Sequence, residues 1–148
     1  MYYLDGSTLV KLPSTGNASY LATDVNDFII DIYDYMAYIA TNSGVKRVGL
    51  NGSGTETLVT TPADQVALAD TVVFFRSGGA IYRLDNGVSR LVLDAGATWM
   101  TVYRDKIYYV TGGCLYRCGT DGLNNQVFYD GQTSSVSFSA GKAYICAE

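Results

Sequence analysis

Residues 105–122, DKIYYVTGGCLYRCGTDG, join two short apolar runs through a pair of glycines and end in a polar turn. Residues 70–87, DTVVFFRSGGAIYRLDNG, have the same layout without a cysteine. Because the layout recurs after about 35 residues whether or not cysteine is present, it indicates a structural repeat and not a redox or metal motif. Each copy predicts two antiparallel strands joined by a tight glycine turn.

The repeat extends over nearly the whole chain. Alignment on the residue before each aromatic strand gives Asp34, Asp70, Asp105 and Gly141, at a spacing of about 36 residues. The aromatic strands are residues 1–4, 35–40, 71–75, 106–110 and 142–146. Strands that carry a base follow at 9–12, 45–48, 81–84 and 115–118. Third strands follow at 56–60, 89–93 and 126–130, with a weaker counterpart at 19–23. A fourth apolar segment occupies 28–32, 65–69, 99–103 and 135–139.

Four short strands per repeat are typical of a propeller blade, which buries its two apolar faces only by stacking on neighbours. The sequence therefore predicts one all-β, β-propeller-like domain over residues 1–148. Its units are approximately 1–33, 34–69, 70–104 and 105–140, with a partial unit at 141–148. About four repeats of ~36 residues fit either a four-bladed ring or part of a larger propeller. Residues 27–40 and 61–70 also show a helical spacing of polar residues, but the register of the repeat favours strands.

The pattern of an aspartate, an aromatic strand, a turn, a Tyr-Arg strand and a second turn resembles a known family. Residues 106–122 carry it most completely, and residues 71–87 and 1–12 carry parts of it. It is similar to the bacterial propeller-like domains akin to the low-density-lipoprotein-receptor-related β-propeller. The resemblance implies a propeller fold and a role in recognising proteins or other ligands, in a family largely without assigned activity. Such domains usually have more blades than the roughly four repeats found here.

Composition excludes two classes of partner. Ten basic and 14 acidic residues give a net charge of −4, and the densest basic run is the two residues at 46–47. A nucleic-acid surface needs clustered Lys and Arg, so none is expected. No stretch approaches the ~20 apolar residues that span a bilayer, so membrane insertion is not expected. The first residues lack the basic region of a signal peptide, which predicts a cytoplasmic protein if the chain is complete and an exported one if it is an excised domain.

The three cysteines are predicted to be structural thiols in buried strand positions. Cys114 and Cys118 lie four residues apart, so on one regular strand they are roughly 13 Å from each other, too far for a disulfide. Zinc needs further ligands, and the chain has only Cys146 as another thiol and no histidine.

Catalysis is not expected. The absence of histidine removes the usual general base and the common nucleophile pairs. Asp34, Asp70 and Asp105 recur with the repeat, as turn residues do. The Asp-Gly turns lack the ligand spacing of a calcium loop. We therefore predict no catalytic residue, no metal and no cofactor.

One base recurs in the same position of each repeat, as Lys11, Arg47, Arg83 and Arg117. This series predicts either contacts to an anion, carboxylate or sugar, or pairing with an acid or a backbone carbonyl between blades. Trp99 is a further candidate for contact with a protein or a carbohydrate. These five residues are the candidate ligand contacts.

The sequence thus favours a non-catalytic binding or scaffolding module for a protein or glycan partner. The alternative is a structural subunit that self-assembles through its terminal strands. If the ends met, residues 1–4 and 142–146 would compete for one place beside residues 135–139, and an unpaired apolar edge pairs readily with another chain. A homo-oligomer or part of a larger propeller is therefore expected, and an enzyme of unfamiliar type is the third hypothesis.

Overall fold

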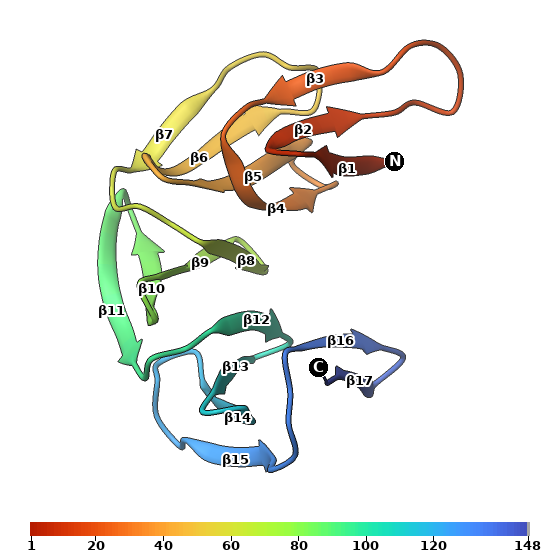
Figure 1. Cartoon of the computed structure of the whole chain (residues 1–148). Helices are drawn as coiled ribbons and strands as arrows, with labels where there is room; N and C mark the ends of the chain where they lie inside the picture. The colour runs from red at the N-terminus through yellow and green to blue at the C-terminus, as the bar shows by residue number, and fades with distance from the viewer. Residues whose placement is uncertain (148) are drawn as a thin grey trace.

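The computed structural model describes residues 1–147, in which every regular element is a β-strand (Figure 1). Seventeen strands form five antiparallel sheets within these residues. Sheet I contains β1 (Tyr2–Asp5), β2 (Thr8–Lys11) and β3 (Ser19–Ala22). Sheet II contains β4 (Val25–Asp31), β5 (Met36–Thr41), β6 (Gly44–Gly49) and β7 (Glu56–Val59). Sheet III contains β8 (Gln65–Ala69), β9 (Val72–Ser77), β10 (Ala80–Asp85) and β11 (Val88–Asp94). Sheet IV contains β12 (Trp99–Tyr103), β13 (Lys106–Thr111), β14 (Cys114–Gly119) and β15 (Gln126–Tyr129). Sheet V contains β16 (Ser135–Ser139) and β17 (Lys142–Cys146).

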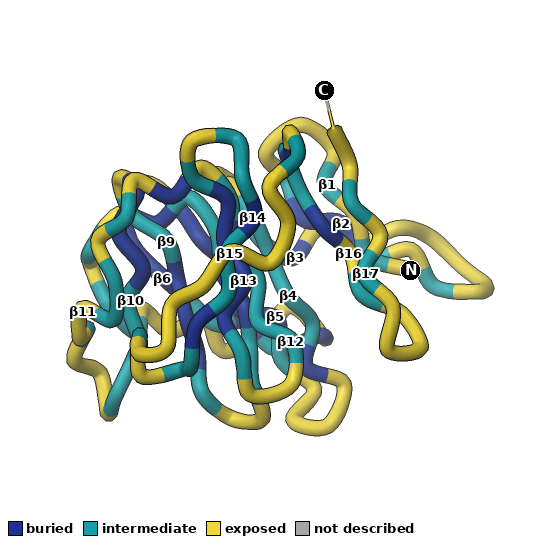
Figure 2. The backbone as a smooth tube through the Cα atoms, turned by 90° about the horizontal axis from the view of Figure 1, so that it is seen from below, coloured by how far each residue is buried: buried dark blue, intermediate teal, exposed yellow. Residues whose placement is uncertain are grey.

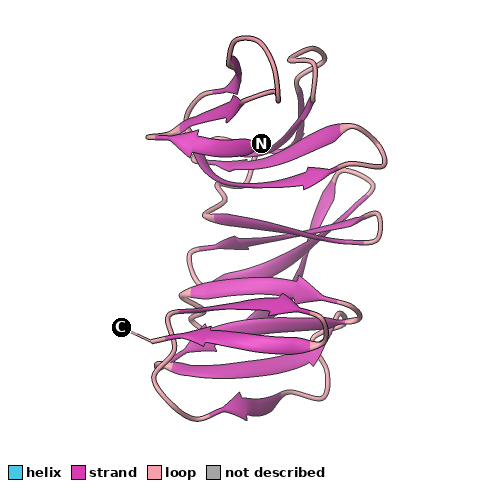
Figure 3. Ribbon diagram, turned by 90° about the vertical axis from the view of Figure 1, so that its right-hand side faces the viewer, coloured by secondary structure: helices cyan, strands magenta, loops and turns pink. Residues whose placement is uncertain are grey.

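The sheets are stacked in chain order along an arc. Figure 1 shows this arc with sheet I and sheet V at its two ends, and Figure 3 shows the layers of strands from the side. The first strands β4, β8, β12 and β16 contact one another in turn. This arrangement confirms the predicted all-β, propeller-like fold. The two stretches with an ambiguous helical spacing, residues 27–40 and 61–70, contain no helix: residues 27–31, 36–40 and 65–69 are strands.

The units defined from the sequence begin at the aromatic strands. In the structure each of sheets II to V begins one strand earlier, as the hydrogen bonds between strands show. The apolar segments at 28–32, 65–69, 99–103 and 135–139 pair with the aromatic strand that follows them. Sheets II, III and IV therefore begin near residues 25, 65 and 99. Apolarity alone does not reveal which of two neighbouring strands a segment pairs with, because both neighbours are apolar.

Each pair of successive sheets encloses its own apolar cluster. Leu9 and Ile39 represent the cluster between sheets I and II, Phe75 the one between II and III, and Ile107 the one between III and IV. The cluster between sheets IV and V contains Val110. The second strands β5, β9 and β13 are buried on both faces, because a sheet packs on each side of them. Figure 2 shows this burial in the middle of the sheets, with exposed residues at the loops.

Strand order divides the stack into two faces. Face 1 carries the turns β4–β5, β8–β9, β12–β13 and β16–β17 and the loops β2–β3, β6–β7, β10–β11 and β14–β15. Face 2 carries the turns β1–β2, β5–β6, β9–β10 and β13–β14 and the connectors from one sheet to the next. On face 2 the same backbone hydrogen bond recurs at each connector, at 2.8–2.9 Å. The donor N–H groups and acceptor carbonyls are Val25 to Ser7, Ala63 to Thr41, Ala97 to Gly79 and Thr133 to Gly113.

At Gly44, the β5–β6 turn lies so close to the end of β7 that there is no room for a side chain. The φ of Gly44 is +128°, and a Cβ would overlap the carbonyl oxygen of Val59. Residues with a Cβ rarely adopt a φ in this range. Gly44 therefore permits the close approach of the β5–β6 turn to the end of β7.

A second interaction joins the first strands. The Asp27 carboxylate on β4 accepts the Val66 N–H of β8 at 3.0 Å, and the Gln65 side chain accepts the Met100 N–H of β12 at 2.9 Å. At the equivalent position of β12, Trp99 packs against the cluster between sheets IV and V. Desolvation by burial raises the pKa of Asp27, although the hydrogen bond from Val66 opposes the rise. The Asp27 carboxylate thus joins β4 to β8, but its charged form is costly to bury.

Replacement of Gly44 should destabilise the fold strongly. We expect Gly44→Ala to lower the free energy of unfolding by about 3 kcal/mol or more, because strain and the overlap with Val59 add. Gly54→Ala is the matched control, since Gly54 also has positive φ but no atom near the added Cβ. It should cost about 1–2 kcal/mol. Urea unfolding measures both, and equal midpoints for the two variants would contradict the packing described.

Asp27 should make stability depend on pH. Because its pKa is raised in the folded state, the folded protein binds the proton more tightly, and stability falls as pH rises from about 3.8, the ordinary value, through the raised pKa. Asp27→Asn keeps an acceptor for Val66 without the charge. Its melting temperature should therefore exceed that of the wild type by more at pH 7 than at pH 3.5. Asp5→Asn, at an exposed position, is the control. A difference between Asp27→Asn and wild type that does not grow with pH would refute the assignment.

Candidate functional site

The four predicted bases occupy equivalent positions on β2, β6, β10 and β14. Each lies opposite an aromatic residue of the preceding strand, and the pairs are Lys11 with Tyr2, Arg47 with Tyr38, Arg83 with Phe74 and Arg117 with Tyr108. The structure does not bring them together. Lys11, Arg83 and Arg117 line three different hollows, between sheets I and II, III and IV, and IV and V respectively. A single belt of converging charge is therefore not present within residues 1–147.

All four bases have an oxygen partner within the chain, and that of Arg117 is the uncharged amide oxygen of Gln126, which accepts from Nε at 3.1 Å. The Lys11 Nζ donates to the Leu50 carbonyl of the next sheet at 2.8 Å. Arg47 pairs with Glu56 at 2.7 Å, and Arg83 pairs with Asp85 at 2.7 Å. Only the Lys11 contact crosses between sheets, so the pairing is mostly local to each sheet. Exposed pairs of this kind contribute little to stability.

Trp99 lies apart from the bases. It begins β12 at face 2, is half-buried, and packs against the apolar cluster of Tyr108, Val110 and Val136. Its position is that of a packing residue between sheets IV and V. The predicted turn aspartates are also in turns. Carboxylates that cap turns include that of Asp31, which accepts the N–H groups of Tyr33 and Asp34, and that of Asp121, which accepts the N–H of Leu123.

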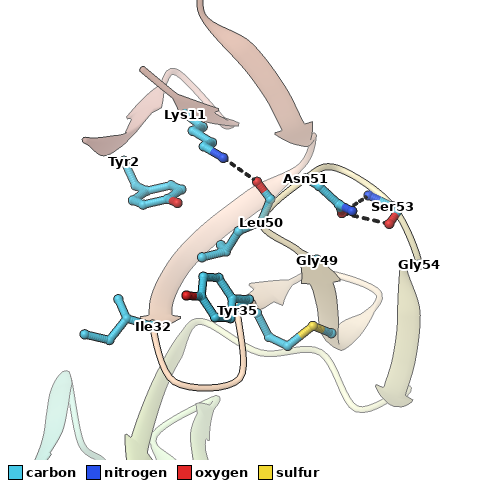
Figure 4. Close-up of a pocket in the computed structure, with 10 residues that line it drawn as sticks. Tyr2, Lys11, Ile32, Tyr35, Gly49, Leu50, Asn51, Ser53 and Gly54 are labelled. Carbon is cyan, nitrogen blue, oxygen red and sulfur yellow. Dashed lines mark hydrogen bonds between the residues drawn. The ribbon is translucent and has the colours of Figure 1, made fainter. Parts of the chain in front are cut away.

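A pocket of about 700 Å³ lies on face 1, between sheets I and II. Figure 4 shows the rings of Tyr2 and Tyr35 and the side chain of Ile32 around a common space, with Lys11 at one side. Met36 and Leu50 add to the apolar lining, and Asn51 and Ser53 supply a polar edge. An apolar cavity with a few polar groups is the usual form of a binding site.

One turn beside this pocket differs from its equivalents. The β4–β5 turn has the four residues 32–35, whereas the β8–β9, β12–β13 and β16–β17 turns have two each. Ile32, Tyr33 and Tyr35 are 64%, 89% and 72% exposed. Turns on the surface usually carry polar side chains. Three large, exposed side chains in one turn therefore mark a contact surface. The sequence pattern did not single out this turn or Asn51, because the turn does not recur and the pocket forms between residues distant in the chain.

The three cysteines are free but are not all buried. Cys118 is 1% exposed, whereas Cys114 is half-buried and Cys146 is exposed. The prediction of buried thiols is therefore right for Cys118 and wrong for Cys146, whose strand β17 lies in the last sheet with little packed on it. Burial raises the pKa of the Cys118 thiol to about 11. A thiol with a raised pKa is a poor nucleophile at neutral pH.

Two further findings concern residues 1–147. No group of three or more His, Cys, Asp or Glu side chains within them is placed to hold a metal ion. No helix of this part of the chain could cross a membrane.

Comparison with known proteins identifies the class of fold. No protein-family model matches the chain, and no curated protein matches it. A chain of a nidogen/laminin complex aligns with a TM-score of 0.73 at 17% identity, over 90% of this chain and 64% of that one. PorZ, an essential surface component of the type-IX secretion system of Porphyromonas gingivalis, aligns with a TM-score of 0.72 at 15% identity, over 95% of this chain. Both are propeller-type folds, so this chain is a β-propeller-type protein.

The chain is shorter than these neighbours. It spans 64% of the nidogen/laminin chain and 22% of the PorZ chain. A third neighbour, from work on the de novo evolutionary emergence of a symmetrical protein, aligns with a TM-score of 0.50 at 11% identity. At these identities the likeness concerns the fold.

Thiol labelling should follow exposure. With iodoacetamide at pH 8, we expect Cys146 to react first, Cys114 more slowly and Cys118 only as fast as the protein unfolds, because burial and a raised pKa both protect it. Intact-mass and peptide analysis after timed labelling gives the order. In denaturant all three should react alike. Rapid native labelling of Cys118, or a mass deficit showing a disulfide, would overturn this prediction.

Proposed function

We propose that the chain is a non-catalytic binding module that recognises a protein partner through face 1. The observation that carries the proposal is the pocket of about 700 Å³ beside the exposed turn at residues 32–35. Tyrosine supplies a large contact area at little entropic cost and is enriched at the centres of protein interfaces. A tyrosine and an isoleucine at the tip of a turn are suited to insert into a partner, while the pocket receives one of the partner's side chains.

A protein partner is favoured over a glycan by the polar groups of the pocket. Asn51 already accepts the N–H and the hydroxyl of Ser53, and Lys11 already donates to Leu50. Few polar groups are left to bind the many hydroxyls of a sugar, whereas apolar area is abundant. One neighbour comes from a nidogen/laminin complex, which accords with protein recognition by this fold. The Tyr-Arg dipeptides at residues 82–83 and 116–117 support a relation to the bacterial propeller-like domains described above.

Self-assembly is the second candidate, and a different surface favours it. Val127, Phe128 and Tyr129 of β15 are 52%, 37% and 44% exposed, and Tyr144 of β17 is 52% exposed. These residues lie at sheets IV and V, at the other end of the arc from the face 1 pocket. A second copy that covered them would bury apolar surface that water now contacts.

Site-specific photo-cross-linking tests the proposal. A benzophenone amino acid at position 33 should give a discrete protein adduct in lysate of the source cells. The control is the same group at position 20, because Tyr20 is also an exposed tyrosine but lies on β3, outside the turn at residues 32–35. Excess unlabelled wild type should compete the adduct away, and excess Tyr35→Ser should compete at least tenfold less well.

The adduct's mass separates the candidates. A hetero-adduct specific to position 33 supports partner recognition through face 1. An adduct of twice the chain's mass, together with a dimer in light scattering, supports self-assembly. Equal adducts from positions 20 and 33, or full competition by Tyr35→Ser, contradict the proposed face.

A further inference from the structure

A cationic groove lies on face 1 between sheets IV and V. Its volume is about 340 Å³. Arg104 and Lys106 come from the β12–β13 hairpin, and Arg117 comes from β14. Asp105 is the acidic residue among the described residues that line it. In a protein of net charge −4, an excess of positive charge around one hollow is a local departure from the rest of the surface.

Arg117 lacks the carboxylate partner that Arg47 has in Glu56 and Arg83 has in Asp85. Glu56 lies opposite Arg47, whereas the neutral Gln126 lies opposite Arg117 at the equivalent position. Within residues 1–147 no carboxylate lies within 4.0 Å of the Arg117 guanidinium. The repeat thus keeps the base in sheet IV but replaces the acid that neutralises it in sheet II.

Both arginines of the groove lie over aromatic rings. The Arg117 guanidinium carbon is 5.4 Å from the centre of the Phe128 ring, and that of Arg104 is 5.3 Å from the centre of the Tyr103 ring. A ring face holds a guanidinium by its plane and leaves the N–H groups at its edge able to donate. The Gln126 amide oxygen accepts from Arg117 Nε at 3.1 Å and Nη2 at 3.3 Å, so the Nη1 side of this guanidinium is the edge that is left for a ligand. Lys106 pairs with Asp105 at 3.3 Å, an exposed pair of the kind that contributes little.

The aromatic walls of the groove pack on one another. The rings of Tyr103 and Phe138 are stacked with centres 4.5 Å apart, and Tyr108 contacts both Phe138 and Phe128. Because these ring faces are already covered, the groove has little to offer a sugar ring or a flat apolar ligand. What it offers is a set of donors with positive charge, which matches a compact oxyanion.

We propose that this groove binds a compact oxyanion, a carboxylate or a phosphate, through the N–H groups of Arg117 and Arg104, with Lys106 adding positive charge. An arginine fork binds such groups in a bidentate manner. The site is separate from the pocket between sheets I and II, and it does not depend on the function proposed for that pocket.

Nuclear magnetic resonance of ¹⁵N-labelled protein tests the site with inorganic phosphate as the probe. The side-chain Nε–Hε signals of Arg104 and Arg117 should shift in a saturable manner, while sodium chloride at equal ionic strength should not reproduce the shift. Arg117→Gln should weaken phosphate binding at least tenfold. Arg104→Gln, at an exposed turn position, should weaken it too and gives a second variant if Arg117→Gln is poorly folded. Arg47→Gln is the matched control, because Glu56 already neutralises Arg47, and it should leave the affinity unchanged.

Two capped tripeptides identify the source of the anion. If N-acetyl-Gly-Glu-Gly-amide shifts the same signals and the Gln analogue does not, the groove takes a carboxylate side chain. If phosphate alone shifts them, the groove takes the free ion. Either result supports the proposal. Shifts that chloride reproduces, that spread equally to Arg47, or that survive both Arg104→Gln and Arg117→Gln would overturn it.

Discussion

Contact between successive sheets is the interaction on which the rest of the structure depends. Each sheet has two apolar faces, and each junction encloses its own cluster, from Leu9 and Ile39 at one end to Val110 at the other. Burial of apolar area is the main favourable contribution to folding, so no sheet is stable without its neighbour. Because the middle strands are used for this packing, exposed groups lie at the turns and along outer strands such as β11 and β15. Recognition is therefore expected on the faces of the stack or on its outer strands.

Much of the fold could be predicted from the sequence, because the repeating residues recur at a fixed spacing along the chain. Aromatic residues such as Tyr38 and Tyr108 recur in step with the second strand, and the strands were found where the register placed them. The start of each sheet could not be predicted. A segment such as residues 65–69 lies between two apolar strands, and only hydrogen bonding decides that it pairs with the strand that follows.

The candidate site was less predictable, for a reason that also follows from the repeat. Comparison of the repeats reveals only what every unit shares, such as the base at Lys11, Arg47, Arg83 and Arg117. The features that distinguish the faces are departures from the period: the long turn at 32–35 and the neutral Gln126 opposite Arg117. Their surroundings are formed by residues that are distant in sequence, so composition and spacing carry no sign of the pocket. The same distance explains why the bases, although equivalent, line separate hollows.

The recurring connector hydrogen bond bears on how such a chain folds and how its length can change. Each bond, such as Ala97 to Gly79 or Thr133 to Gly113, joins partners only about twenty residues apart, and this short separation favours rapid folding. A junction is thus encoded almost entirely in the segment that spans it. Duplication of such a segment would add a layer whose contacts are already specified, and its deletion would leave the two flanking layers compatible with each other. The fold can therefore lengthen by duplication of one repeat, and a change in a single turn can then give the new repeat a different binding specificity.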